Sequence, residues 1–152
     1  MDELYSVNTK PFKRTYLVIQ LLSAAAIIGS YFLGSSGLFF VPAIGFSRLI
    51  TFPALLLMFI VTLVHNRTLR KRIDALGSIE DFEIRVQVYE RVYRHRMQWN
   101  MITCLIICLL FILSGRYFFL YFSIFQVVLY LPFYPNPLLF RRELKNEEII
   151  LY

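Results

Sequence analysis

The chain has 152 residues, which is room for one domain, and its composition excludes a water-soluble globular protein. Hydrophobic residues make up 58% and charged residues only 17%, whereas charged residues account for about a quarter of an average soluble domain. Aromatic residues reach 17%, a share that suits lipid-facing Phe and interfacial Tyr. The composition therefore indicates a single integral membrane domain spanning residues 1–152.

The first fifteen residues contain acids and bases and are predicted to form a short tail outside the membrane. Residues 16–34 then carry no charge, and this length is close to the roughly 20 residues that a helix needs to cross a bilayer. The apolar core of a cleavable signal peptide is shorter, at roughly 7 to 15 residues. We therefore interpret 16–34 as a retained first transmembrane span.

Small residues recur at every fourth position along the first span, at Ala26, Ser30 and Gly34. Such a stripe lets another helix approach closely in a membrane, where hydrophobicity alone gives helices no reason to associate. We expect the stripe to be a packing surface, including for a protein partner or for a second copy in a homo-oligomer.

The segment 35–47 combines helix-breaking glycines and a proline with strongly apolar side chains. Irregular backbone at membrane depth is tolerated only against protein or a wet cavity, so we expect this loop to lie at the interface or to re-enter the bilayer. The second span follows at 49–64 and reaches about 24 Å at about 1.5 Å per residue. Because that is shorter than the hydrocarbon core, we expect an earlier helix start or a locally thinner bilayer.

The polar segment 65–99 is predicted to be a hairpin of two helices. The second span can continue through Leu69, Ile73 and Leu76, and Gly77 is typical of a residue that ends a helix. The next helix is predicted to begin at Ser78, with an acid three residues later as in a capping box. Its apolar residues have the alternating spacing of three and four that is typical of a coiled-coil seam: Ile79, Phe82, Val86, Tyr89 and Tyr93.

A β-strand is the alternative for residues 82–88, because they alternate strictly between apolar and polar side chains. A lone strand would have no partner, so the helix is the favoured interpretation. As a helix, this arm has twenty-two residues against twelve before the turn, and it carries a second apolar stripe. We therefore predict an unmatched surface that contacts a protein partner or lipid headgroups, made of Ile84, Val88, Val92, Arg85, Arg91, Arg94 and Arg96.

The third and fourth spans are predicted at 100–114 and 117–131. The connection at Ser114, Gly115 and Arg116 is so short that the two helices must form a tight antiparallel hairpin. Three prolines between 132 and 137 then end helical structure. Residues 138–152 are predicted to be a charged tail, with a short amphipathic helix as one interpretation.

Basic residues are distributed unevenly among the segments outside the spans. The N-terminal tail holds three, the segment 65–99 eight and the C-terminal tail three of the sixteen, whereas the two opposite connections hold one each. By the positive-inside rule both termini and 65–99 face the cytoplasm, in a membrane of the bacterial cytoplasmic type. The predicted fold class is an all-α, multi-pass membrane protein, a bundle of four transmembrane helices with a cytoplasmic helical hairpin between spans 2 and 3.

No pattern of catalytic or nucleotide-binding residues is present, and the net charge of +6 follows from topology and does not indicate nucleic-acid binding. The spans contain no acidic or basic residue, which disfavours ion-coupled transport. Gln126 and Ser123 form the candidate intramembrane polar site, although most such groups are interhelical hydrogen bonds worth about 0.6 kcal/mol. Cys104 and Cys108 lie four residues apart in one span and are expected to be buried free thiols.

His65 and His95 lie at the cytoplasmic ends of two spans that should be neighbours, where two imidazoles could hold a haem or a metal ion. No supporting pattern of other ligands accompanies them. Interfacial polar residues are therefore the favoured interpretation, and no cofactor or metal is predicted.

Three functions are compatible with these features. The leading hypothesis is a non-catalytic subunit or scaffold that presents the basic hairpin to a partner or to the membrane surface. The alternative is an oligomeric pore or passive transporter, which would use Gln126 and Ser123. An enzyme acting on lipid or quinone ranks third, because it would need an activated acid, base or metal that the sequence does not supply.

Overall fold

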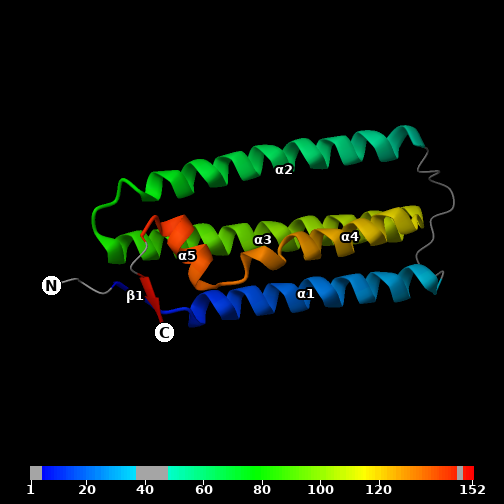
Figure 1. Ribbon diagram of the computed structural model, residues 1–152. Coiled ribbons are helices and arrows are strands. Elements are labelled where there is room, and N and C mark those ends of the chain that lie inside the picture. The colour runs from blue at the N-terminus through cyan, green and yellow to red at the C-terminus, as the bar shows by residue number, and fades with distance from the viewer. Residues whose placement is uncertain (1–4, 37–47, 147–148) are drawn as a thin grey trace.

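The computed structural model describes residues 5–36, 48–146 and 149–152, and helices account for most of them (Figure 1). This confirms the helical part of the predicted fold class. The apolar loop 35–47 lies almost wholly outside the described residues. The described elements are β1 (Tyr5–Val7), α1 (Lys10–Ser35), α2 (Arg48–Leu76), α3 (Phe82–Ser114), α4 (Tyr117–Leu129), a 3₁₀ turn (Leu131–Phe133), α5 (Pro137–Leu144) and β2 (Ile149–Leu151).

Three of the described helices are long and apolar enough to cross a membrane: α1, α3 and the part of α2 from Phe52 to Leu76. Helix α4 has 13 residues and therefore extends only about 20 Å. It meets the same criterion only together with α5, from which it is separated by a bend of 78°. The described residues thus contain three helices that are long and apolar enough to cross a membrane, or four if this bent pair counts as one.

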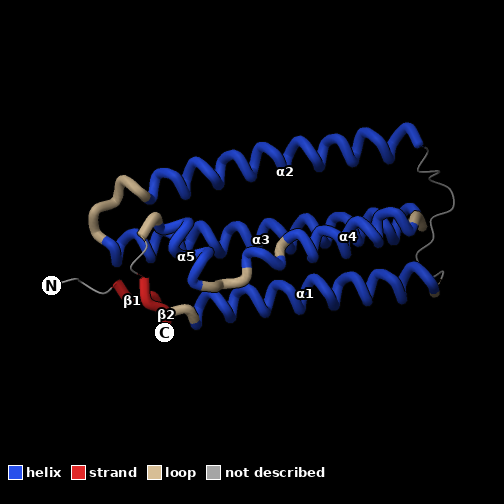
Figure 2. The backbone as a smooth tube through the Cα atoms, viewed as in Figure 1, coloured by secondary structure: helices blue, strands red, loops and turns tan. Residues whose placement is uncertain are grey.

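Helix α1 runs parallel to α3 and packs along its length (Figure 2). At one end the Phe12 ring lies 5.3 Å from that of Tyr93, and at the other end Gly34 faces Phe111. A Cβ on Gly34 would lie 2.7 Å from the Phe111 ring, and Ser30 is buried. The small-residue stripe is therefore used within the chain, and a homo-oligomer formed through it would compete with α3.

Helices α2 and α3 form a hairpin whose turn differs from the predicted one. Helix α2 ends at Leu76, directly before Gly77, as expected. Helix α3 begins at Phe82 and not at Ser78, because Asp81 is its N-cap and accepts hydrogen bonds from the backbone of Glu83 and Ile84. Residues 82–88 are helical, which confirms the predicted helix and excludes the alternative strand.

The two ends of the chain pair with each other, which the sequence did not predict. Strands β1 and β2 are parallel, with Ser6 opposite Ile150, and both the backbone N–H and the hydroxyl of Thr9 donate to the carbonyl of Tyr152. The predicted tails are therefore ordered over these residues, and the all-α class needs this small sheet added. We call β1, β2 and α5 the terminal clasp.

An aromatic core joins the terminal clasp to the α2–α3 hairpin and to the start of α1. The ring of Phe12 lies at its centre, 5.6 Å from Tyr89, 5.3 Å from Tyr93 and 5.0 Å from Phe140. The partly buried residues of the predicted seam pack on the same core: Ile79, Phe82 and Val86. The chain's own ends thus cover this seam. We call the clasp, the turn region of the hairpin and the start of α1 the head.

Candidate functional site

Helix α2 packs loosely against the rest of the molecule. Among its described side chains only Leu69 and Leu76 are buried, and both lie in the part of the helix near the head. Figure 1 shows α2 along one side of the α3–α4 hairpin, on the opposite side from α1. This loose packing leaves space between α2 and α4.

Two adjoining cavities fill that space, one of about 590 Å³ towards the head and one of about 260 Å³ deeper in the bundle. They share four lining residues, Thr62, Asn66, Gln126 and Leu129, so they form one continuous depression. We call it the α2–α4 groove. Its volume lies in the range of small-molecule sites, which is about 300 to 1,000 Å³.

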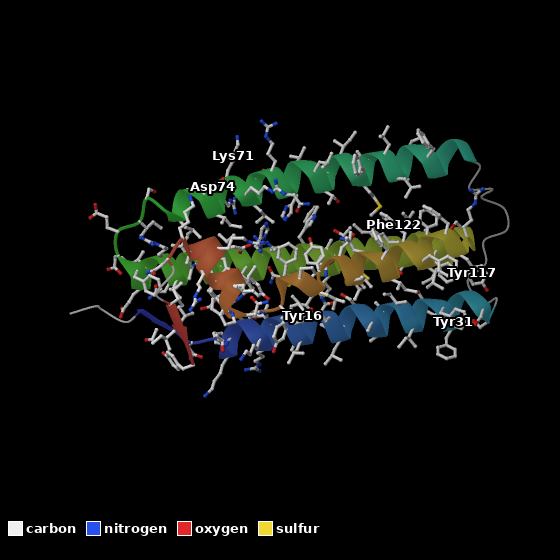
Figure 3. All side chains as sticks on the ribbon, viewed as in Figure 1. Tyr16, Tyr31, Lys71, Asp74, Tyr117 and Phe122 are labelled. Atoms are coloured by element: carbon white, nitrogen blue, oxygen red, sulfur yellow. The ribbon has the colours of Figure 1, made fainter. Side chains whose placement is uncertain are left out.

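The deeper half of the groove is apolar. Helix α2 contributes Leu55, Met58 and Phe59, and α4 contributes Phe122 and Phe125. Figure 3 shows Phe122 on the side of α4 that faces α2. Phe59 and Phe125 are more than half exposed, so this half of the groove is open at its side.

The half of the groove near the head is charged, and its centre is a buried ion pair. One nitrogen of Arg96 donates to both carboxylate oxygens of Glu143, at 3.0 and 3.1 Å, and each residue is only 6% exposed. The hydroxyl of Tyr89 donates to the same carboxylate at 2.7 Å, and the Arg96 guanidinium lies 4.7 Å from the centre of the Phe133 ring. These contacts give both carboxylate oxygens a donor, and such bonding is what allows a buried pair to be tolerated.

Tyr89 lies in the head, outside the predicted spans, and remains a hydrogen-bond donor at physiological pH. Burial raises the pKa of its hydroxyl well above the ordinary value, and the nearby charge of Glu143 raises that pKa further. The tyrosine therefore keeps its proton and its bond to Glu143.

Two further arginines line the same half, Arg70 from α2 and Arg142 from α5. A guanidinium nitrogen of Arg142 lies 3.7 Å from a carboxylate oxygen of Glu143, but the Arg142 side chain is 70% exposed. The lining of this cavity therefore contains three arginines and one acid. Because Arg96 already neutralises Glu143, a positive charge remains at the mouth of the groove.

Gln126 lies at the junction between the two halves. Its amide nitrogen donates to the side-chain oxygen of Asn100 at 3.4 Å, and the amide nitrogen of Asn100 is buried with no partner among the described residues. Ser123, predicted to share a polar site with Gln126, is buried instead and donates to the carbonyl of Leu120. Only Gln126 of that predicted pair lines the groove.

The predicted contact surface on α3 is divided between inward and outward side chains. Arg96 and Val92 are buried, Val88 is half-buried, and Arg85 donates to the backbone carbonyls of Ile79 and Leu144. Three members face outward: Ile84, which is 50% exposed, Arg91 and Arg94. Arg94 also pairs with Glu90 one turn earlier, at 2.6 Å.

The structure brings the two histidines together between α2 and α3. The ring of His65 stacks on Trp99 with centroids 4.4 Å apart and lies 5.3 Å from His95. Over the residues that the structure describes, no group of three or more His, Cys, Asp or Glu could hold a metal ion. Cys104 and Cys108 are free and buried in α3.

Glu143, Arg70 and Arg142 were not among the predicted site residues. Glu143 had no signal in the sequence beyond being one acid in a charged tail, and its role depends on the fold of α5 against α3.

Comparison with family models, with curated proteins and with solved structures finds no match for this chain.

Proposed function

We propose that the protein is a non-catalytic membrane subunit or scaffold that holds a rigid, basic head at the cytoplasmic surface. The observation that carries this proposal is the aromatic core of the head, which ties both chain ends to the α2–α3 hairpin. A hairpin that is packed on a core of its own suits a fixed docking platform better than a mobile loop.

Charge and length support the cytoplasmic placement of the head. Both described ends of the chain lie in it, and fourteen of the sixteen basic residues belong to the segments that build or flank it. Helix α3 has 33 residues and so extends about 50 Å, whereas a hydrocarbon core measures about 30 Å. About 20 Å of the hairpin would therefore stand clear of the hydrocarbon.

The outward face of α3 supplies the contact surface in this proposal. Ile84 is a large apolar side chain that is half exposed, and Arg91 and Arg94 lie exposed on the same helix. Interfaces commonly combine an apolar anchor with arginines. A partner protein that carries acidic residues around an apolar pocket would complement this face.

Site-specific photocrosslinking in cells tests the proposal. A photoreactive amino acid at Ile84, Gln87 or Arg91 should give a discrete adduct with one protein, because these positions face outward from the head. The matched control is the same amino acid at Leu105 or Leu109, which are exposed on the apolar part of α3 and should contact lipid. Adducts at the control positions alone, or at no position, would argue against a docking platform.

A further inference from the structure

We propose that the α2–α4 groove binds one anionic membrane phospholipid, with its phosphate at the arginine end and an acyl chain between α2 and α4. This site is separate from the outward face of α3 on which the scaffold proposal depends. Three observations carry it: the order of polarity along the groove, the charge at its mouth and its open side.

The order of polarity along the groove matches that of a phospholipid. Arginines lie at the end near the head, Thr62, Asn66 and Gln126 lie at the junction, and apolar side chains line the rest. A phospholipid has a phosphate, then ester and glycerol oxygens, then hydrocarbon. Amide and hydroxyl donors at the junction would bond the ester oxygens, which can only accept hydrogen bonds.

The charge at the mouth selects an anionic ligand. Arg96 is held by Glu143 and Phe133. Arg70 and Arg142 are exposed, and Arg142 makes only a long 3.7 Å ion pair with Glu143, so these two arginines can turn to a ligand. Both are exposed and come from different elements, α2 and α5, so they can approach a phosphate from two sides. The planar guanidinium matches phosphate oxygens in bidentate geometry.

The open side of the groove favours a lipid over a polypeptide. The deeper half is bordered by exposed apolar residues of α2 and α4, so an acyl chain could enter from the bilayer without unfolding the bundle. A transmembrane helix of a partner, or of a second copy, would have to place apolar residues against the charged mouth. That would take the exposed guanidinium groups of Arg70 and Arg142 out of water without supplying a new counter-charge.

Native mass spectrometry of the purified full-length protein in a neutral detergent tests the proposal. Dioleoylphosphatidylglycerol should bind at one molecule per chain, about tenfold more tightly than dioleoylphosphatidylcholine. The reason is that phosphatidylglycerol has a net negative charge, whereas the choline cation of phosphatidylcholine neutralises its phosphate. The double variant Arg70→Gln/Arg142→Gln should lose about tenfold or more of that affinity. The matched control Arg91→Gln/Arg94→Gln removes the same charge from the outward face and should bind normally.

A second variant tests the apolar half independently of charge. Met58→Trp places a larger side chain in the deeper cavity and should weaken phosphatidylglycerol binding while the charged mouth stays intact. Thermal unfolding of each variant in the same detergent establishes that it is folded. If Met58→Trp unfolds, Phe125→Trp on the facing helix serves the same purpose.

Several outcomes would overturn the proposal. Equal affinity for the two lipids, or equal losses in the two double variants, would mean a non-specific charge effect. Inorganic phosphate that displaces phosphatidylglycerol completely, together with an unchanged affinity in Met58→Trp, would mean a phosphate site without lipid recognition. A dimer mass that excludes lipid would assign the groove to a second copy of the chain.

Discussion

Glu143 links α5 to α3 through a buried ion pair. Its carboxylate accepts from Arg96 and from the Tyr89 hydroxyl inside the head, and both charged residues are 6% exposed. Removing two charges from water costs several kcal/mol per ion, and their contact returns this only when all groups are bonded. Removing one partner therefore lowers the free energy of unfolding by much more than the intact pair contributes to it.

Glu143→Ala should lower the free energy of unfolding by about 3 to 5 kcal/mol, because Arg96 would stay buried without its counter-charge. The control is Glu90→Ala, which removes an acid from the exposed pair with Arg94 and should change stability by less than about 1 kcal/mol. Unfolding in mixed micelles, followed by circular dichroism, measures both. Similar small losses for the two variants would mean that the Glu143 pair is solvated in solution.

The helices themselves follow from patterns that the sequence contains, whereas the strands do not. Unbroken apolar runs and the spacing of three and four predicted most of α1, α2 and α3. Strands β1 and β2 have three residues each, too few for an alternating pattern, and their partners lie more than 140 residues apart. The start of α3 was misplaced because Ser78 and Asp81 are both ordinary N-caps, and only the fold of the turn selects Asp81.

Packing between α1 and α3 makes two glycines of α1 behave in opposite ways. A Cβ on Gly34 would lie 2.7 Å from the ring of Phe111, which is only 2% exposed and has little room to move. Gly34→Ala should therefore cost about 1 to 3 kcal/mol through overpacking. Gly29→Ala, five residues earlier, meets nothing within 4 Å and should be neutral or stabilising by up to about 1 kcal/mol.

Chemical unfolding of the two alanine variants in the same mixed micelles measures this difference. The substitution, the helix and the detergent are identical, so the comparison isolates the contact with Phe111. Equal stabilities would show that α1 does not lie on α3 at this depth. A Gly34→Ala variant that is stable but dimeric would instead indicate that the stripe serves a second copy.

The groove and the head arise only from the arrangement of whole helices. Gln126 was selected from the sequence because it is a polar residue within an apolar run, and it does line the groove. Arg70 and Arg142 could not be selected, because each is one of many basic residues outside the spans. They share a cavity because α2 packs loosely and the chain bends by 78° between α4 and α5.

The two ends of the bundle should lie on opposite sides of the membrane. Figure 3 shows Tyr31 and Tyr117 towards one end, and Lys71 and Asp74 towards the other, where most of the basic residues lie. Because positively charged segments are retained in the cytoplasm, we expect Tyr117 outside and the exposed Gln87 inside. Single cysteines at these positions, in a Cys104→Ser/Cys108→Ser background, report this directly.

A membrane-impermeant maleimide applied to intact cells should label Tyr117→Cys and should leave Gln87→Cys unlabelled until the cells are broken. Both side chains are exposed on the protein surface, so burial within the protein does not explain a difference in labelling. The reverse labelling would place the head outside. The scaffold proposal in its cytoplasmic form would then fail. Lipid binding in the α2–α4 groove would still be open to its own test, because it requires only that the arginines of the groove lie at headgroup depth.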